Sequence, residues 1–155
     1  MSTDKPSRQT FSVKVNGTDR RVEALPETPI LYLLRNDLHI LSPRYGCGGE
    51  QCGACQVQVD GVPRASCTLA VGNIDDAEIT TLEGLNHGPA LRAAFLANNA
   101  GQCGYCLAGI LVAADALLQT NPRPGRAEIM AALDGHLCRC GSHNRIIRSI
   151  EDAAR

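Results

Sequence analysis

The 155-residue sequence predicts an α+β protein, with strands in its first half and helices in its second. Between residues 11 and 81, apolar and polar side chains alternate in short runs that are separated by Asn-Gly and Asp-Gly turns, as antiparallel strands do. From residue 89 onward, apolar residues recur at helical spacing. We therefore expect two domains, at residues 1–82 and 83–155.

The first strands are predicted to form a hairpin. In residues 11–15, Phe, Val and Val alternate with Ser and Lys, which is the period of a half-buried strand. Asn16 and Gly17 follow, and this dipeptide favours a two-residue turn with positive φ angles. Residues 21–25 are expected to return as the second strand.

A short helix, a loop and a second hairpin are predicted next. Thr28 is expected to be the N-cap of the helix, with Pro29 in the first helical position. Residues 45–55 are rich in Gly and Cys and predict a loop. The alternating segment 56–59 and the Asp-Gly turn after it predict another hairpin. Residues 79–81 are expected to complete the sheet.

Four helices are predicted in the second half, over residues 89–98, 106–119, 126–137 and 143–154. The second of them carries apolar residues on all sides, which is typical of a buried helix. The Asn-Pro-Arg-Pro-Gly segment at 121–125 ends it, because proline and glycine interrupt helices.

The charge balance argues against some function classes. Fifteen basic and 16 acidic side chains give a net charge of −1, without the basic surplus of a nucleic-acid-binding protein. No apolar stretch is long enough to span a bilayer, and residues 1–10 lack the apolar core of a secretory signal. We expect a cytoplasmic protein, whose eight cysteines stay reduced and serve metal binding or catalysis.

Four cysteines in the first half follow the spacing of a plant-type 2Fe–2S site. Four residues separate Cys47 from Cys52, two separate Cys52 from Cys55, and eleven separate Cys55 from Cys67. Two irons need four thiolates in two pairs, and a loop wraps them only where little side chain intrudes. Loop glycines meet that need and offer N–H groups to cluster sulfurs. They are Gly46, Gly48, Gly49 and Gly53.

The other four cysteines are Cys103, Cys106, Cys138 and Cys140. The first two lie at the predicted start of helix 106–119, and the last two precede the final helix. Two helix–loop junctions that meet in a bundle would bring these thiolates together, where positive helix ends favour an anionic cluster. Because no cysteine is left over, two 2Fe–2S clusters account for all eight.

Other uses of the cysteines remain open at this point. Structural zinc is a rival, above all for the second set, because Cys-x2-Cys is half of a common zinc pattern. A disulfide framework would require an oxidising compartment. A Rieske centre would require two histidine ligands, and the histidines are not spaced for that role. We expect surface or packing roles for His39, His87, His136 and His143.

Six short motifs make the sequence similar to one known family. They are LRNDL at 34–38, YGCG at 45–48, CGAC at 52–55, TTLEGL at 80–85, QCGYC at 102–106 and LCRCG at 137–141. On these motifs the chain resembles the small iron–sulfur subunit of the xanthine oxidase family of molybdenum hydroxylases. Within that family it is similar to the small subunits of isoquinoline 1-oxidoreductase and bacterial nicotinate dehydrogenase.

The resemblance implies a β-grasp, ferredoxin-like domain followed by a C-terminal four-helix bundle. It implies that the first cysteine set holds an outer cluster. The second set would hold an inner cluster, next to a molybdopterin cofactor that a large partner subunit binds. Gln102 matches the family's glutamine that hydrogen-bonds the pterin, whereas its alternative role is a solvated loop residue. Gly104 and Arg139 are also expected at the cofactors, and the alternative for Arg139 is a surface ion pair.

The function implied by the resemblance is electron relay within an oxidoreductase. The large subunit would hydroxylate an aromatic N-heterocycle or oxidise an aldehyde. Electrons would then pass through both clusters to a FAD subunit or to cytochrome c. This chain is too short to hold that active site, so we expect no catalytic residue in it. The alternatives are a free-standing two-cluster ferredoxin and a zinc-stabilised structural module.

Two positions depart from the family pattern. Glu50 stands where a second glycine is common, and its carboxylate is expected to lower the potential of the outer cluster. Leu107 and Ala108 replace Thr-Pro at a helix start, which should cost little because alanine is a good helix former.

Overall fold

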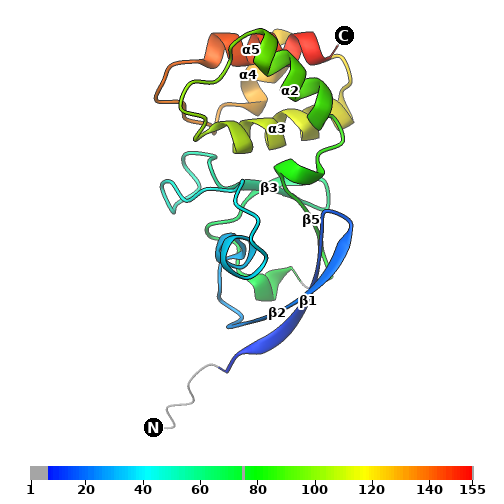
Figure 1. Cartoon of the computed structure of the whole chain (residues 1–155), viewed down its shortest axis with the longest axis vertical. Helices are drawn as coiled ribbons and strands as arrows, with labels where there is room; N and C mark the ends of the chain where they lie inside the picture. Colours follow the sequence, from blue (N-terminus) through cyan, green and yellow to red (C-terminus); the bar gives the residue numbers. More distant parts are fainter. Residues whose placement is uncertain (1–6, 75, 155) are drawn as a thin grey trace.

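The structure is a computed structural model that describes residues 7–74 and 76–154. It is a mixed α+β protein in which a half built on a twisted sheet and a half built of helices are stacked along the long axis (Figure 1). In the described part of the chain, no helix combines the length and apolar character needed to cross a membrane.

Five strands form one mixed sheet in the order β2-β1-β5-β3-β4. β1 (Gln9–Val15) pairs antiparallel with β2 (Thr18–Ala24) and parallel with β5 (Glu78–Thr80). β5 pairs antiparallel with β3 (Gln56–Val59), which pairs antiparallel with β4 (Val62–Ala65). The second and the fourth strand therefore form the two edges of the sheet.

Both predicted hairpin turns are confirmed. Asn16 and Gly17 have φ angles of 51° and 76°, and Asp60 and Gly61 have φ angles of 50° and 77°. Positive φ at both turn positions matches the twist of the flanking strands. The strand after the first turn begins at Thr18, earlier than expected, because pairing continues up to the turn.

The expected N-cap at Thr28 is wrong. The cap is Pro29, in an extended conformation (φ −62°, ψ 137°), and no side chain caps α1 (Ile30–Tyr32). Pro29 is held extended by a bridge to Ala70. The helix then widens into a π-helical turn over Leu33–Asp37.

Four longer helices occupy the described part of the second half. They are α2 (Gly88–Ala97), α3 (Leu107–Thr120), α4 (Arg126–Ala132) and α5 (His143–Ala153). α3 is buried, as expected, because it packs on β3 with one side and on α2 and α4 with others. α2 and α5 pack on each other at the far end of the molecule.

The third of these helices is shorter than predicted. It ends at Ala132, whereas the sequence predicted helix to residue 137. The chain leaves the helix because Leu137 turns its N–H to the carbonyl of Cys52 in the sheet half (3.1 Å). Short 3₁₀ turns at Val71–Asn73 and Leu82–Gly84 complete the described elements.

Two hydrophobic cores lie on either side of the junction between the halves. One is formed by the sheet and α1, and the other by the four longer helices. The expected boundary at residues 82/83 lies between β5 and α2, and it stays a prediction. The largest fully buried apolar side chains of the helical core are Leu91, Ile110, Leu118, Ile129, Ile146 and Ile150.

Candidate metal centres

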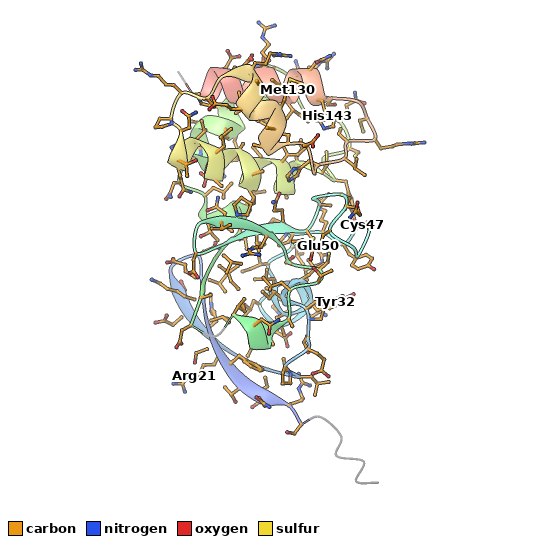
Figure 2. The ribbon with its side chains drawn as sticks, turned by 180° about the vertical axis from the view of Figure 1, so that it is seen from behind. Arg21, Tyr32, Cys47, Glu50, Met130 and His143 are labelled. Atoms are coloured by element: carbon orange, nitrogen blue, oxygen red, sulfur yellow. The ribbon has the colours of Figure 1, made fainter. Side chains whose placement is uncertain are left out.

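The cysteine loop of the sheet half presents its first thiol outward. Cys47 is exposed, and Figure 2 shows it with Glu50 and Tyr32 along one side of the molecule. The backbone N–H groups of Gly49 and Gln51 donate to its sulfur at 3.4 and 3.2 Å. These two donors lower the pKa of the Cys47 thiol to about 7, because they stabilise the thiolate.

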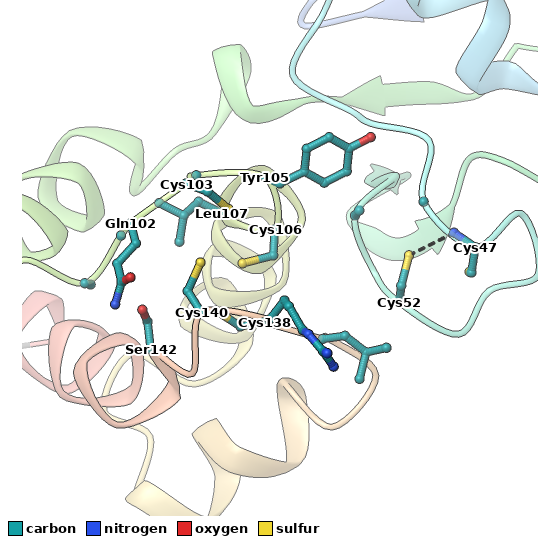
Figure 3. A pocket seen from close by; sticks show the side chains of 17 residues that line it. Cys47, Cys52, Gln102, Cys103, Tyr105, Cys106, Leu107, Cys138, Cys140 and Ser142 are labelled. Carbon is teal, nitrogen blue, oxygen red and sulfur yellow. Dashed lines mark hydrogen bonds between the residues drawn. The ribbon is translucent and has the colours of Figure 1, made fainter.

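Cys47 also pairs with the next cysteine of the loop. Its backbone N–H donates to the sulfur of Cys52 at 3.4 Å (Figure 3). The other two thiols of the set form a buried pair, since Cys55 is 2% exposed and Cys67 is 8% exposed. Burial first, and then the neighbouring Cys67 thiol, raise the pKa of Cys55 to about 11. The first set therefore consists of one outward pair and one inward pair.

Two glycines of this loop are required by space. A Cβ on Gly46 would lie 2.6 Å from the sulfur of Cys52. Gly53 has a φ of +71°, and a Cβ there would lie 2.4 Å from the ring of His136. A larger residue at either position would displace a cysteine or separate the two halves.

The second cysteine set lies at two helix starts. Cys103 and Cys106 immediately precede α3, and Cys138 and Cys140 precede α5. All four line one cavity of about 270 Å³, which opens beside the loop of the first set (Figure 3). The structure thus brings together four thiols that are more than thirty residues apart at their widest separation.

These four thiols also form pairs. Cys103 contacts Cys140: the N–H of Tyr105 and then the Cys140 thiol lower the pKa of Cys103. Cys106 contacts Cys138, and burial followed by that thiol raises the pKa of Cys106 to about 12. Again one pair contains a buried thiol and the other an exposed one.

The thiol of Cys138 is subject to opposing effects. Its partial burial acts to raise the pKa. The N–H of Ser142 and the thiol of Cys106 act in the other direction, so that the net pKa is lowered. A thiol held in its anionic form by backbone donors is suited to binding a metal.

The other predicted site residues surround the same cavity. Gln102, Gly104 and Arg139 all line it, and Gln102 and Arg139 are exposed. In the described residues Arg139 makes no ion pair. An added Cβ would meet nothing within 4 Å at Gly104, or at Gly49 in the first loop. Close approach is therefore not the reason for glycine at these two positions, contrary to our expectation for Gly49.

The donor set fits 2Fe–2S clusters. Each set supplies four sulfurs as two pairs, and N–H groups point at several of them. Two irons joined by bridging sulfides each take one such pair. Over residues 7–74 and 76–154, no three Cys, His, Asp or Glu side chains converge as a group around a single metal ion.

The two cysteine sets meet at the junction between the halves. The N–H of Leu137 donates to the carbonyl of Cys52 at 3.1 Å. A Cβ on Gly109 of α3 would lie only 1.9 Å from the carbonyl oxygen of Gly53. The sequence offered no sign of this contact, because it joins segments that are more than fifty residues apart.

A buried polar network forms a second contact between the halves. Asp115, completely buried in α3, accepts hydrogen bonds from the amides of Gln58 (2.9 Å) and Gln119 (2.5 Å). It also accepts from the backbone N–H of His87 at 2.6 Å. The amide of Gln58 additionally donates to Val112. Sequence analysis missed this network, although Asp115 is the only charged residue of its helix.

Comparisons with known proteins agree with the geometry. Residues 81–151 match the family model described as a 2Fe-2S binding domain. Residues 1–100 match the model of a 2Fe-2S iron-sulfur cluster binding domain. The two matches divide the eight cysteines into the same two sets that the structure brings together.

Relatives of similar length are components of oxidoreductases. The A-type subunit of nicotinate dehydrogenase from Pseudomonas putida is 45% identical over 148 residues, which covers 94% of each chain. The alpha subunit of isoquinoline 1-oxidoreductase from Brevundimonas diminuta is 40% identical over 91% of this chain and 95% of its own. The crystal structure of quinoline 2-oxidoreductase from Pseudomonas putida 86 superposes with a TM-score of 0.89, at 34% identity over 96% of this chain and 93% of its own.

Proposed function

The chain belongs to the xanthine oxidase family of molybdenum hydroxylases as an iron–sulfur subunit, and from this premise we propose that it relays electrons through two 2Fe–2S clusters. The outer cluster is assigned to Cys47, Cys52, Cys55 and Cys67. The inner cluster is assigned to Cys103, Cys106, Cys138 and Cys140.

The observation that carries this proposal is the pairing of the thiols. In both sets one pair contains a buried thiol of raised pKa and the other an exposed thiol of lowered pKa. Two irons bridged by sulfide take such a set without rearranging the chain. A cluster of this kind, when bound, takes up and releases one electron at a time.

The chain's own residues hold the two sets close together. The hydrogen bond from Leu137 to Cys52 connects the backbone next to Cys138 with the backbone of a cysteine in the first set. His136, which is 5% exposed, packs against Gly53 beside it and excludes water from this junction. We infer that electrons cross from one set to the other here.

The inner cavity is the side on which we place the large molybdopterin subunit. Gln102 lines this cavity and is exposed, so it is free to hydrogen-bond a pterin that the partner brings. Tyr105 and Leu137 line it too, at 46% and 62% exposure, and apolar and aromatic groups of this kind are common at protein interfaces. Arg139 is proposed to offset thiolate charge there. We further propose that residues 1–82 form a β-grasp domain and residues 83–155 a four-helix bundle.

The names of the relatives suggest a substrate class for the holoenzyme. Nicotinate, isoquinoline and quinoline are aromatic N-heterocycles, and enzymes with these names are similar to this chain over nearly its whole length. We propose hydroxylation of an aromatic N-heterocycle by the partner subunit, with aldehyde oxidation as the second candidate. The next electron acceptor is proposed to be a FAD subunit or cytochrome c.

Metal analysis and EPR spectroscopy of the purified complex test this proposal. We expect about four iron and four acid-labile sulfide per chain, two S = 1/2 signals after dithionite reduction, and molybdenum in the co-purifying subunit. Cys55→Ser should abolish one signal and Cys106→Ser the other, which assigns each signal to a cysteine set. Iron and sulfide without a molybdenum-bearing partner would indicate a free ferredoxin. Zinc in place of iron would refute the relay.

A further inference from the structure

Ser142 carries a buried hydroxyl with no partner. The residue is 5% exposed, and its Oγ makes no hydrogen bond with any described residue. Such a group is destabilising unless something supplies the missing hydrogen bond. In a native protein it therefore points to a partner that is absent from the polypeptide itself.

The helix that begins after Ser142 does not use this hydroxyl. Serine at an N-cap normally accepts a hydrogen bond from an N–H of the first turn through its side chain, with an extended backbone. Ser142 has φ −83° and ψ 5°, which is close to helical, and it makes no side-chain cap. The N–H groups of Arg145 and Ile146 donate to its carbonyl oxygen instead, both at 3.0 Å. Capping therefore does not explain why serine stands here.

The hydroxyl lies in the cavity of the second cysteine set. Ser142 lines this cavity, and Figure 3 shows its side chain beside Gln102 and Cys140, directed toward the space that they border. The backbone N–H of the same serine already contacts the thiol of Cys138. Ser142 thus approaches the inner cysteine set with its main chain and with its side chain.

We propose that the Ser142 hydroxyl donates a hydrogen bond to a sulfur of the inner cluster and raises its reduction potential. The inference rests on the proposed function, because it requires that cluster. Donors to cluster sulfurs stabilise the reduced state, which carries one more negative charge than the oxidised state. The hydroxyl oxygen is fully enclosed in this chain alone. A group bound by the flanking cysteines reaches it more readily than a pterin held by another subunit.

An EPR-monitored redox titration of the purified complex tests this role. In Ser142→Ala the inner-cluster potential should fall by an amount equivalent to about a tenfold change in the reduction equilibrium, which is about 59 mV for one electron. The outer-cluster potential should not change. Ser142→Thr keeps the hydroxyl and should stay near the wild-type value. Ser149→Ala is the matched control, because Ser149 is buried in the same helix and its hydroxyl donates to the carbonyl of Arg145 at 2.7 Å.

The outcomes separate this inference from the proposed function. If both EPR signals are present and the inner potential in Ser142→Ala equals that in Ser149→Ala, the hydroxyl does not bond the cluster and the inference is overturned. If the wild-type complex holds no iron, the proposed function fails first. Should Ser142→Ala not retain its inner cluster, Ser142→Gly removes the same hydroxyl at a position where glycine is well tolerated. The same fall in potential is expected there, and an unchanged potential overturns the inference.

Discussion

Gly109 of α3 should not tolerate even a methyl group. Its Cα faces the loop of the first cysteine set, and a Cβ there would lie 1.9 Å from the carbonyl oxygen of Gly53 and 3.0 Å from its carbonyl carbon. Both partners are backbone atoms, so no side chain can rotate away. Gly109→Ala therefore forces α3 and the loop apart.

The size of the effect follows from these distances. Ordinary contact begins at 3.4 Å, so the two segments must separate by about 1.5 Å along the clash. If the helical half moves as a body, the bond between Leu137 and Cys52, now 3.1 Å long, is stretched beyond hydrogen-bonding range. Overpacking costs about 1–3 kcal/mol and the lost bond about 0.5–1.5 kcal/mol, while alanine regains about 1 kcal/mol of helix propensity. We expect a net loss of about 2 kcal/mol.

Thermal unfolding and EPR spectroscopy of the complex measure the two consequences. A loss of about 2 kcal/mol lowers the melting temperature of a chain of this size by roughly 4–8 °C. Moving the clusters apart weakens the magnetic interaction between them, which narrows any splitting of their EPR signals. Gly135→Ala is the control, because a Cβ there meets nothing within 4 Å on the neighbouring segment. The reasoning is refuted if Gly109→Ala melts with Gly135→Ala and keeps the wild-type spectrum.

Three further perturbations have defined expectations. Asp115→Ala leaves the buried amide of Gln58 and other donors without an acceptor and should cost about 3 kcal/mol in urea unfolding; a loss below about 1 kcal/mol would contradict the network's role. Glu50→Gln keeps an acceptor for the Thr68 hydroxyl but removes a charge. It should raise the outer-cluster potential by up to about 40 mV, since an exposed charge interaction is worth at most about 1 kcal/mol; an unchanged or lower potential argues against the charge effect. In iron-free chain, iodoacetamide should label Cys47 increasingly as pH rises through about 7, where its thiolate forms, whereas Cys55 should stay unreactive until about pH 11. Equal labelling of both thiols at pH 8, followed by mass spectrometry, would contradict this order.

Local sequence was a good guide where local chemistry decides the conformation. The Asn16-Gly17 and Asp60-Gly61 turns were predictable because few residues other than Gly, Asn and Asp accept positive φ in adjacent positions. The buried character of α3 was equally predictable, because its apolar residues surround the whole helix.

Sequence was a poor guide where a distant segment intervenes. The alternation over residues 56–59 predicted one polar face, yet Gln58 is 2% exposed because that face meets α3 and Asp115. Helix α4 was expected to continue to residue 137, but tertiary contact of Leu137 with the first cysteine loop ends it early. Neither contact leaves a signal within a window of ten residues.

The sequence by itself determined the α+β order, the tight turns and the membership of each cysteine in one of two spaced sets, because these depend on neighbours in the chain. Only the tertiary structure decided which thiols pair and that Gly53 and Gly109 bring the two sets together. It also decided that the Ser142 hydroxyl remains without a partner in the inner cavity. Pairing, close approach and burial depend on distances between segments that are far apart in sequence, and packing of the two halves sets those distances.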